Sequence, residues 1–159
     1  MTSAAKPLAI VARAGIAAAE ELDLERARTE RVIPLPPHVV WGAECLAGDE
    51  RAVVVADTRE VLTVVRLSDA MHAPAGSNGR APVCLPDVRL LCAFSPLERS
   101  PETTFEILNL RTLLQTRELP TNRYAIAQAL APDGSIYLLD SGPRVSSVSR
   151  YARSALADT

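Results

Sequence analysis

The stretch ALAPDGSIYLLDSG, from Ala129 to Gly142, decides which fold this chain is expected to adopt. Two short apolar runs flank a Pro-Asp-Gly turn whose aspartate is Asp133. In such a turn proline presets the backbone, aspartate accepts hydrogen bonds from nearby amides, and glycine takes the positive φ. Apolar runs on both sides of a turn of this kind predict a two-stranded antiparallel hairpin.

The same kind of hairpin is predicted a second time, in AECLAGDERAVVVADT, from Ala43 to Thr58. When the two segments are aligned, Asp49 falls on Asp133. The alignment extends upstream, where Pro36 falls on Pro120, and both separations are 84 residues. Self-similarity at a fixed spacing indicates a repeat architecture, and it has to be considered before any local assignment.

The likeness extends beyond the two hairpins. One deletion later Asp57 corresponds to Asp140, and upstream the residues 22–24 (LDL) resemble residues 108–110 (LNL) after a two-residue slip. The separation of 84 is twice 42, and about 40–45 residues is the length of one four-stranded propeller blade. The blade between the hairpins would run from about residue 51 to 86 and would carry the turn-rich loop MHAPAGSNGRAP, residues 71–82.

The predicted fold class is therefore all-β: an array of about four degenerate four-stranded blades in one propeller-like domain, with an incomplete ring. The runs AVVV and IYLL lack polar alternation, which suits strands that are covered on both faces. Blade-like units are expected at roughly 8–35, 36–77, 78–119 and 120–153 of the domain 1–159. Strands are predicted at 8–14, 20–26, 29–36, 39–47, 51–58, 60–68, 88–96, 103–110, 113–120, 123–131, 135–141 and 145–152.

A second fold, α+β with an internal duplication, is the alternative. Residues 15–31, GIAAAEELDLERARTER, have high helix propensity, and their apolar residues fall near helical spacing. Residues 105–119 also permit a helix. We favour the repeat because LDL and LNL equally fit short strands closed by Arg-Thr turns.

The segment APDGSIYLLDSG, residues 131–142, resembles the hairpin of WD-repeat and NHL-repeat propellers, in which a turn of this kind joins the first two strands of a blade. Residues 53–67, VVVADTREVLTVVRL, are similar to the NHL-repeat phrase in which Asp-Thr follows the second strand. The resemblance covers residues 8–152 loosely and the two hairpins well, and it implies a β-propeller. No Trp-Asp pair ends a third strand and no Gly-His precedes a first strand, so the resemblance is to propeller blades in general.

Composition argues against several classes of partner. The formal net charge is −2, and no basic cluster is interleaved with aromatic residues, so neither nucleic acid nor a membrane is expected as a partner. The cysteines Cys45, Cys84 and Cys92 lie in apolar runs without CxxC spacing, which predicts reduced, packed thiols and an intracellular, most simply cytoplasmic, location. The apolar run 7–12 ends at Arg13 and is shorter than the core of a signal peptide.

Motifs for catalysis or cofactor binding are missing from the sequence. His38 and His72 have no partner at metal-binding spacing, and neither a nucleophile elbow nor a phosphate-binding glycine motif is present. The chain is therefore not expected to be an enzyme or to hold a metal or cofactor. The residues expected to stabilise turns and strand ends are Asp49, Asp57, Asp133, Gly134 and Asp140. In the alternative, a small propeller hydrolase of the lactonase kind, the side chains offered to a central metal would be Glu44, Asp49, Asn122 and Asp133.

A candidate binding surface lies where the chain approaches the two repeated inner strands. One copy supplies His38 and Trp41, and the other supplies Asn122, Arg123 and Tyr124. Tryptophan, tyrosine and arginine are favoured at interface hot spots, so these residues predict a protein-binding face near the axis. The predicted function is a non-enzymatic protein–protein interaction scaffold. With the α+β fold, the alternative would be a duplicated adaptor or ligand-sensing domain.

The predicted arc is incomplete at both ends. At about 42 residues per blade the 159 residues supply under four blades; the N-terminal trio of strands lacks an inner strand, and the C-terminal one ends after its third. An open arc exposes strand edges and blade faces that another surface should cover. We therefore expect the chain to be a fragment of a longer propeller, or to complete its ring with a second chain, such as a copy of itself.

Overall fold

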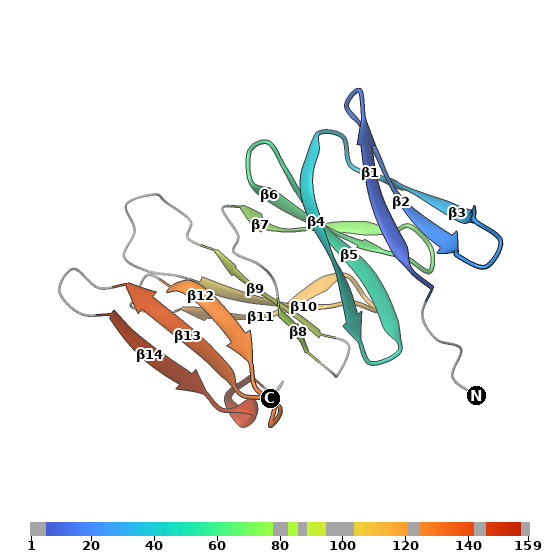
Figure 1. Cartoon of the computed structure of the whole chain (residues 1–159). Coiled ribbons are helices and arrows are strands. Elements are labelled where there is room, and N and C mark those ends of the chain that lie inside the picture. The colour runs from blue at the N-terminus through green and yellow to red at the C-terminus, as the bar shows by residue number, and fades with distance from the viewer. Residues whose placement is uncertain are drawn as a thin grey trace.

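The computed structural model describes residues 6–77, 83–85, 89–94, 104–120, 125–141 and 146–156. These residues form four antiparallel sheets in succession along the chain, which we call blades 1 to 4 (Figure 1). Blade 1 consists of β1 (Leu8–Arg13), β2 (Ile16–Asp23) and β3 (Arg28–Leu35). Blade 2 consists of β4 (Val39–Ala47), β5 (Glu50–Asp57), β6 (Val61–Arg66) and β7 (His72–Ser77). Blade 3 consists of β8 (Val83–Leu85), β9 (Arg89–Phe94), β10 (Thr104–Asn109) and β11 (Leu114–Pro120). Blade 4 consists of β12 (Ala125–Leu130), β13 (Ile136–Ser141) and β14 (Ser146–Tyr151), followed by the short 3-10 helix η1 (Arg153–Leu156).

The blades are arranged as an open arc. The first strand of each blade lies beside the first strand of the next, so β1 contacts β4, β4 contacts β8, and β8 contacts β12. The remaining strands of each blade follow in chain order away from that inner edge. Figure 1 shows blade 1 at the upper right and blade 4 at the lower left, with blades 2 and 3 between them. The predicted all-β fold with an incomplete ring is confirmed.

The segment with the highest helix propensity, residues 15–31, contributes instead to the hairpin of β2 and β3. The buried side chains decide this outcome: Ala17 and Ala19 of β2 and Ile33 and Leu35 of β3 all pack against blade 2. A period of two places these four residues on one face of a sheet. Burial of that face outweighs the small helix preference of alanine and glutamate, and the α+β alternative is wrong.

Successive blades pack face to face through apolar side chains. We call the face of a blade toward the preceding blade its rear face, and the face toward the following blade its forward face. Between blades 1 and 2 the buried residues are Ala17, Ala19, Ile33 and Leu35 on one side and Val53, Val55, Val65 and Leu67 on the other. Between blades 2 and 3 they are Cys45, Ala52, Val54, Ala56, Leu62, Val64 and Ala75 facing Leu108, Leu110 and Leu113. Between blades 3 and 4 they are Leu85 and Ile107 facing Ile136 and Leu138.

One turn recurs in blades 1, 2 and 3 at a spacing of 43 residues. It joins β2 to β3, β6 to β7 and β10 to β11, and it ends each time in a residue with positive φ: Ala27 (φ 49°), Ala70 (φ 60°) and Leu113 (φ 56°). In two copies this last residue donates its amide to the carbonyl four residues earlier, over 2.9 Å to Arg66 and 2.8 Å to Asn109. In blades 2 and 3 this turn joins the third strand to the fourth, and in blade 1 it joins β2 to β3. The three strands of blade 1 therefore correspond to the second, third and fourth strands of blades 2 and 3.

One sequence expectation, that the blade between the two hairpins runs from about residue 51 to 86, is wrong. Residues 51–77 belong with β4 in blade 2, and the intervening blade is blade 3, which begins at β8. The loop predicted at 71–82 contains β7 instead, the outer strand of blade 2, whose proline Pro74 is tolerated at a sheet edge.

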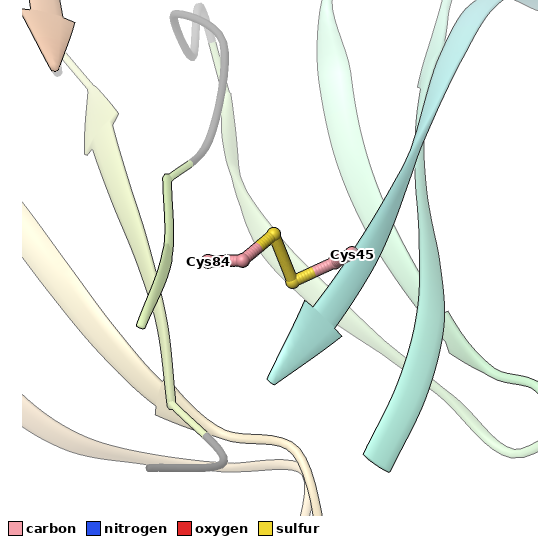
Figure 2. Close-up of a disulfide and its surroundings, with 2 residues drawn as sticks. All are labelled: Cys45 and Cys84. Carbon is pink, nitrogen blue, oxygen red and sulfur yellow. A yellow bond between two sulfur atoms is a disulfide. The ribbon is translucent and has the colours of Figure 1, made fainter. Parts of the chain in front are cut away.

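A disulfide joins the inner strands of blades 2 and 3. Cys45 on β4 is bonded to Cys84 on β8, with the two Cα atoms 5.6 Å apart (Figure 2). The prediction of reduced thiols is therefore wrong for these two residues, and the argument from reduced cysteines to a reducing compartment loses its basis. The intracellular location stays a prediction without that support.

Arg66 links the turn of blade 2 to the turn of blade 3. Its guanidinium forms two hydrogen bonds to the carboxylate of Asp69, at 3.0 and 2.6 Å, and also donates to the backbone carbonyls of Leu110 and Arg111. The hydrogen bonds from Arg66 are the main reason why the pKa of Asp69 is lowered to about 2.

We expect the Asp69 carboxyl to titrate with a midpoint of about 2 in the folded protein. Because the folded pKa lies below the usual aspartate value of about 3.9, the contribution of this pair to stability is present above pH ~4 and is lost as the pH falls toward 2. NMR titration of the side-chain carbonyl measures the midpoint directly. Arg66→Gln should raise it toward 3.8, whereas Arg26→Gln, on the equivalent turn of blade 1, should not move it. A wild-type midpoint near 3.8 would contradict the assigned pair.

Candidate functional site at the junction of blades 1 and 2

A pocket of about 500 Å³ opens where blade 1 meets blade 2. Its walls come from the connection between β3 and β4, the end of β5, and the start of β6. The lining residues are Pro36, Pro37, His38, Val39, Val55, Asp57, Thr58, Arg59, Val61 and Thr63. The prolines and valines give it apolar walls, and the other five residues place polar or charged groups around them.

His38 is held at this pocket by its backbone. It lies in the turn before β4 with φ 61°, a left-handed conformation that histidine adopts more readily than most residues. Its amide donates to the carbonyl of Gly15, in the β1–β2 turn, over 3.3 Å. The side chain lies so close to Gly15 that an added Cβ there would be 3.4 Å from the imidazole Cε1. The β1–β2 turn of blade 1 therefore fixes the position of His38 on blade 2.

The opposite wall is the turn between β5 and β6. Asp57 closes this turn, because its Oδ1 accepts hydrogen bonds from the amides of Arg59 (2.8 Å) and Val61 (3.0 Å). Arg59 is exposed, and its guanidinium has no hydrogen bond or ion pair with the described part of the chain; the same holds for the imidazole of His38. Two donors without a protein partner thus border one pocket, and both can bind an acceptor group brought by a ligand.

Trp41 lies on the other side of β4. A β-bulge at Val40 breaks the pairing between β4 and β5, and beyond it Trp41 lies on the same face of β4 as Cys45, which faces blade 3. Trp41 does not line the pocket and is 38 % exposed on the forward side of blade 2. The remaining predicted binding residues, Asn122, Arg123 and Tyr124, lie outside the described residues.

The carboxylates offered for the hydrolase alternative are each engaged elsewhere. Glu44 forms an ion pair with Arg51. Asp49, in the β4–β5 turn, forms an ion pair with Arg111 of blade 3. The hydrogen bond that the Arg111 guanidinium donates to the Asp49 carboxylate lowers the pKa of Asp49.

Asp133 stabilises the Pro-Asp-Gly turn. Its Oδ1 accepts the amide of Ser135 at 2.9 Å, which is the first cause of its lowered pKa, and its Oδ2 pairs with Arg150 at 2.8 Å. Gly134 has φ +81° and packs against the side chain of Arg153. Asp140 is the β13 residue opposite Ala125 and Ser147. Asn122 lies outside the described residues.

Sequence reasoning found His38 but missed the rest of the pocket. Arg59 lies in the turn between the predicted strands 51–58 and 60–68, and Thr63 lies within the second of them, but neither was singled out as a binding residue. The available signal was Asp57-Thr58, a strand end that recurs at Asp140, because residues just after a strand end are where a propeller presents its loops.

Two features are absent from the described part of the chain. No helix in this part of the chain is long and apolar enough to cross a membrane. Within the same residues, no group of three or more histidine, cysteine, aspartate or glutamate side chains could hold a metal ion.

Comparisons with known proteins place the fold but not the family. No protein-family model matches the chain, and no curated protein matches it either. Among solved structures, the β-propeller domain of the trilobed protease from Pyrococcus furiosus, described as having an open velcro topology, is 14 % identical over 95 % of this chain, with a TM-score of 0.54. This chain spans 56 % of that one.

Two weaker likenesses were also found. The N-terminal domain of Nup159 is 16 % identical over 91 % of this chain and 41 % of its own length, with a TM-score of 0.43. A chain from an S. cerevisiae assembly of Dbp5, Nup159 and Gle1 is 17 % identical over 94 % of this chain and 42 % of its own length, with a TM-score of 0.45. The similarity to the protease domain, together with the four successive sheets, shows that this chain has a β-propeller fold.

Proposed function

We propose that this chain is a non-enzymatic interaction module that binds a segment of a partner protein in the pocket formed by blade 2 and its connection to blade 1. The observation that carries the proposal is the pair of exposed donors, the His38 imidazole and the Arg59 guanidinium, which have no partner among the described residues and lie beside walls of proline and valine. Such a site suits an extended segment that places an apolar side chain between the walls and a carboxylate or carbonyl on the donors. Arginine is among the residues that dominate protein interfaces.

The positions of the acidic residues support a binding role over hydrolysis. Glu44, Asp49 and Asp133 each pair with a different arginine on a different part of the arc. A metal-dependent propeller hydrolase needs such carboxylates to converge at one centre. Here they stabilise turns and blade contacts.

The test is a binding assay with a matched control. A partner is first captured and identified by mass spectrometry, then purified, and its affinity is measured for the wild type and for the double variant His38→Asn, Arg59→Ala. Asparagine tolerates positive φ, so this exchange removes the imidazole while it preserves the turn. We expect the double variant to weaken binding by at least about tenfold, or about 1.4 kcal/mol.

The control is Arg26→Ala, which removes an exposed arginine from the β2–β3 turn and should leave the affinity unchanged. Unchanged affinity in the double variant would contradict binding at this pocket. Turnover of lactone or ester substrates, together with a stoichiometric bound metal, would favour the hydrolase alternative instead.

A further inference from the structure

The two ends of the arc each present an unpaired blade face. Every junction inside the chain joins the forward face of one blade to the rear face of the next. Blade 1 has no blade in the described chain on its rear face, and blade 4 has none on its forward face. One unpaired face is therefore a rear face and the other is a forward face, and these two kinds of face pack together at every junction inside the arc.

The rear face of blade 1 keeps a residue that the other blades use for packing. The repeated turn carries a leucine three residues before its positive-φ residue: Leu24, Leu67 and Leu110. Leu67 is 2 % exposed against blade 1 and Leu110 is 0 % exposed against blade 2, whereas Leu24 is 69 % exposed. Leu24 thus occupies the position that a preceding blade covers in both other copies.

The strands of blade 1 extend this face. Ala18 and Glu20 alternate with the buried Ala19, and Val32 lies directly opposite Glu20 on β3. Val32 is 60 % exposed. The rear face of blade 1 is therefore an apolar surface with one carboxylate, Glu20, within it.

The forward face of blade 4 is apolar as well. Tyr137 and Leu139 alternate with the buried Leu138 on β13, and Val148 lies opposite Leu139 on β14. Val148 is 66 % exposed, and Tyr137 and Leu139 remain partly exposed. Arg150, opposite Tyr137, also lies on this face, where its guanidinium pairs with the Asp133 carboxylate.

We propose that a second copy of this chain covers these faces head to tail, so that blade 4 of one copy packs its forward face on the rear face of blade 1 of the other. This contact repeats the junction already made three times inside the chain. Two four-blade arcs joined in this way at both ends make eight blades, within the usual range of about four to eight for propellers. The association uses surfaces other than the pocket and goes beyond the proposed function.

The test is the mass of the purified chain in solution, by light scattering across the micromolar range. We expect the wild type to form dimers, and Leu24→Glu or Val148→Glu to weaken the association by at least about tenfold. Leu114→Glu, at an equally exposed position in the outer part of blade 3, is the matched control and should associate like the wild type. Unchanged circular dichroism, and a thermal midpoint equal to that of the wild type diluted to the point where it is monomeric, establish that the variants fold.

A mixing experiment distinguishes head-to-tail contact from a symmetric one. Leu24→Glu chains retain a working blade 4 face, and Val148→Glu chains retain a working blade 1 face. The mixture should therefore form a heterodimer through one intact junction, although each variant alone stays monomeric. A monomeric wild type would overturn the proposal, as expected if blades of another protein cover these faces. The proposal would also be overturned if both variants still formed dimers as tightly as the wild type, or if the mixture of the two variants stayed monomeric.

Discussion

Leu110→Ala is expected to lower the free energy of unfolding by about 2–5 kcal/mol, whereas Leu24→Ala should change it by less than about 0.5 kcal/mol. The two leucines hold the same position in the repeated turn, and the substitution removes the same atoms. Leu110 is 0 % exposed between blades 2 and 3, so its loss leaves a cavity; Leu24 is 69 % exposed, so its loss leaves none. The difference between the two losses in the free energy of unfolding measures how much a covering blade stabilises this leucine position.

Chemical denaturation, followed by circular dichroism at concentrations where light scattering shows a monomer, measures both free energies. Leu67→Ala serves as the internal control, because Leu67 is buried at the junction of blades 1 and 2 and should behave like Leu110. Equal losses at Leu24 and Leu110 in the monomer would contradict the arrangement of the blades described above.

Reduction of the Cys45–Cys84 disulfide is expected to destabilise the folded chain by ~4 kcal/mol. The bond closes a loop with a sequence separation of 39 residues. Cross-linking a loop of about 40 residues removes conformational entropy from the unfolded chain, and this entropy corresponds to about 4 kcal/mol at 25 °C. Because the bond joins β4 to β8, its loss also removes the covalent link between blades 2 and 3.

The measurement compares denaturation with and without a thiol reductant. The double variant Cys45→Ala, Cys84→Ala serves as the control, since reductant should not change its stability further. Each single variant should lose about as much as the double one, because either substitution opens the loop. If the reductant leaves the free energy of unfolding of the wild type unchanged, the disulfide does not contribute to stability.

The hairpins could be predicted from sequence because their causes are local. The Pro-Asp-Gly turn at Asp133 fixes its own backbone through a hydrogen bond to Ser135, two residues away. The run 52–55 is buried on both faces of β5, as its lack of polar residues indicated. Turn chemistry and burial of a strand between neighbours leave their pattern within a dozen residues.

Features that depend on neighbouring blades left a weaker pattern. The 43-residue repeat was found only at double spacing, between residues 22–24 and 108–110. In the intermediate copy, Arg66 stands where the other copies have Asp23 and Asn109, so the turn shares with them only its leucine and its backbone conformation. The pairing of Cys45 with Cys84 follows from the approach of β4 to β8, which cysteine spacing alone does not report.

The candidate site shows the same division. His38 could be singled out because it precedes a predicted strand that the structure contains as β4. Arg59 could not, because its relation to His38 arises only when the turn after β5 lies opposite the turn before β4. Trp41 was grouped with His38 by sequence distance, but the alternation of β4 directs it toward blade 3.

The face-to-face stacking of the blades makes this chain a nearly one-dimensional system. Among the described residues, the main contacts of each blade are with the blades next to it, so the free energy of folding is close to a sum of intrinsic blade terms and nearest-neighbour junction terms. Blades 2 and 3 each share two junctions and are covalently linked to one another, whereas blades 1 and 4 each share one. Cooperativity is therefore concentrated in the middle of the arc, and the end blades are the units that can open first without unfolding the rest.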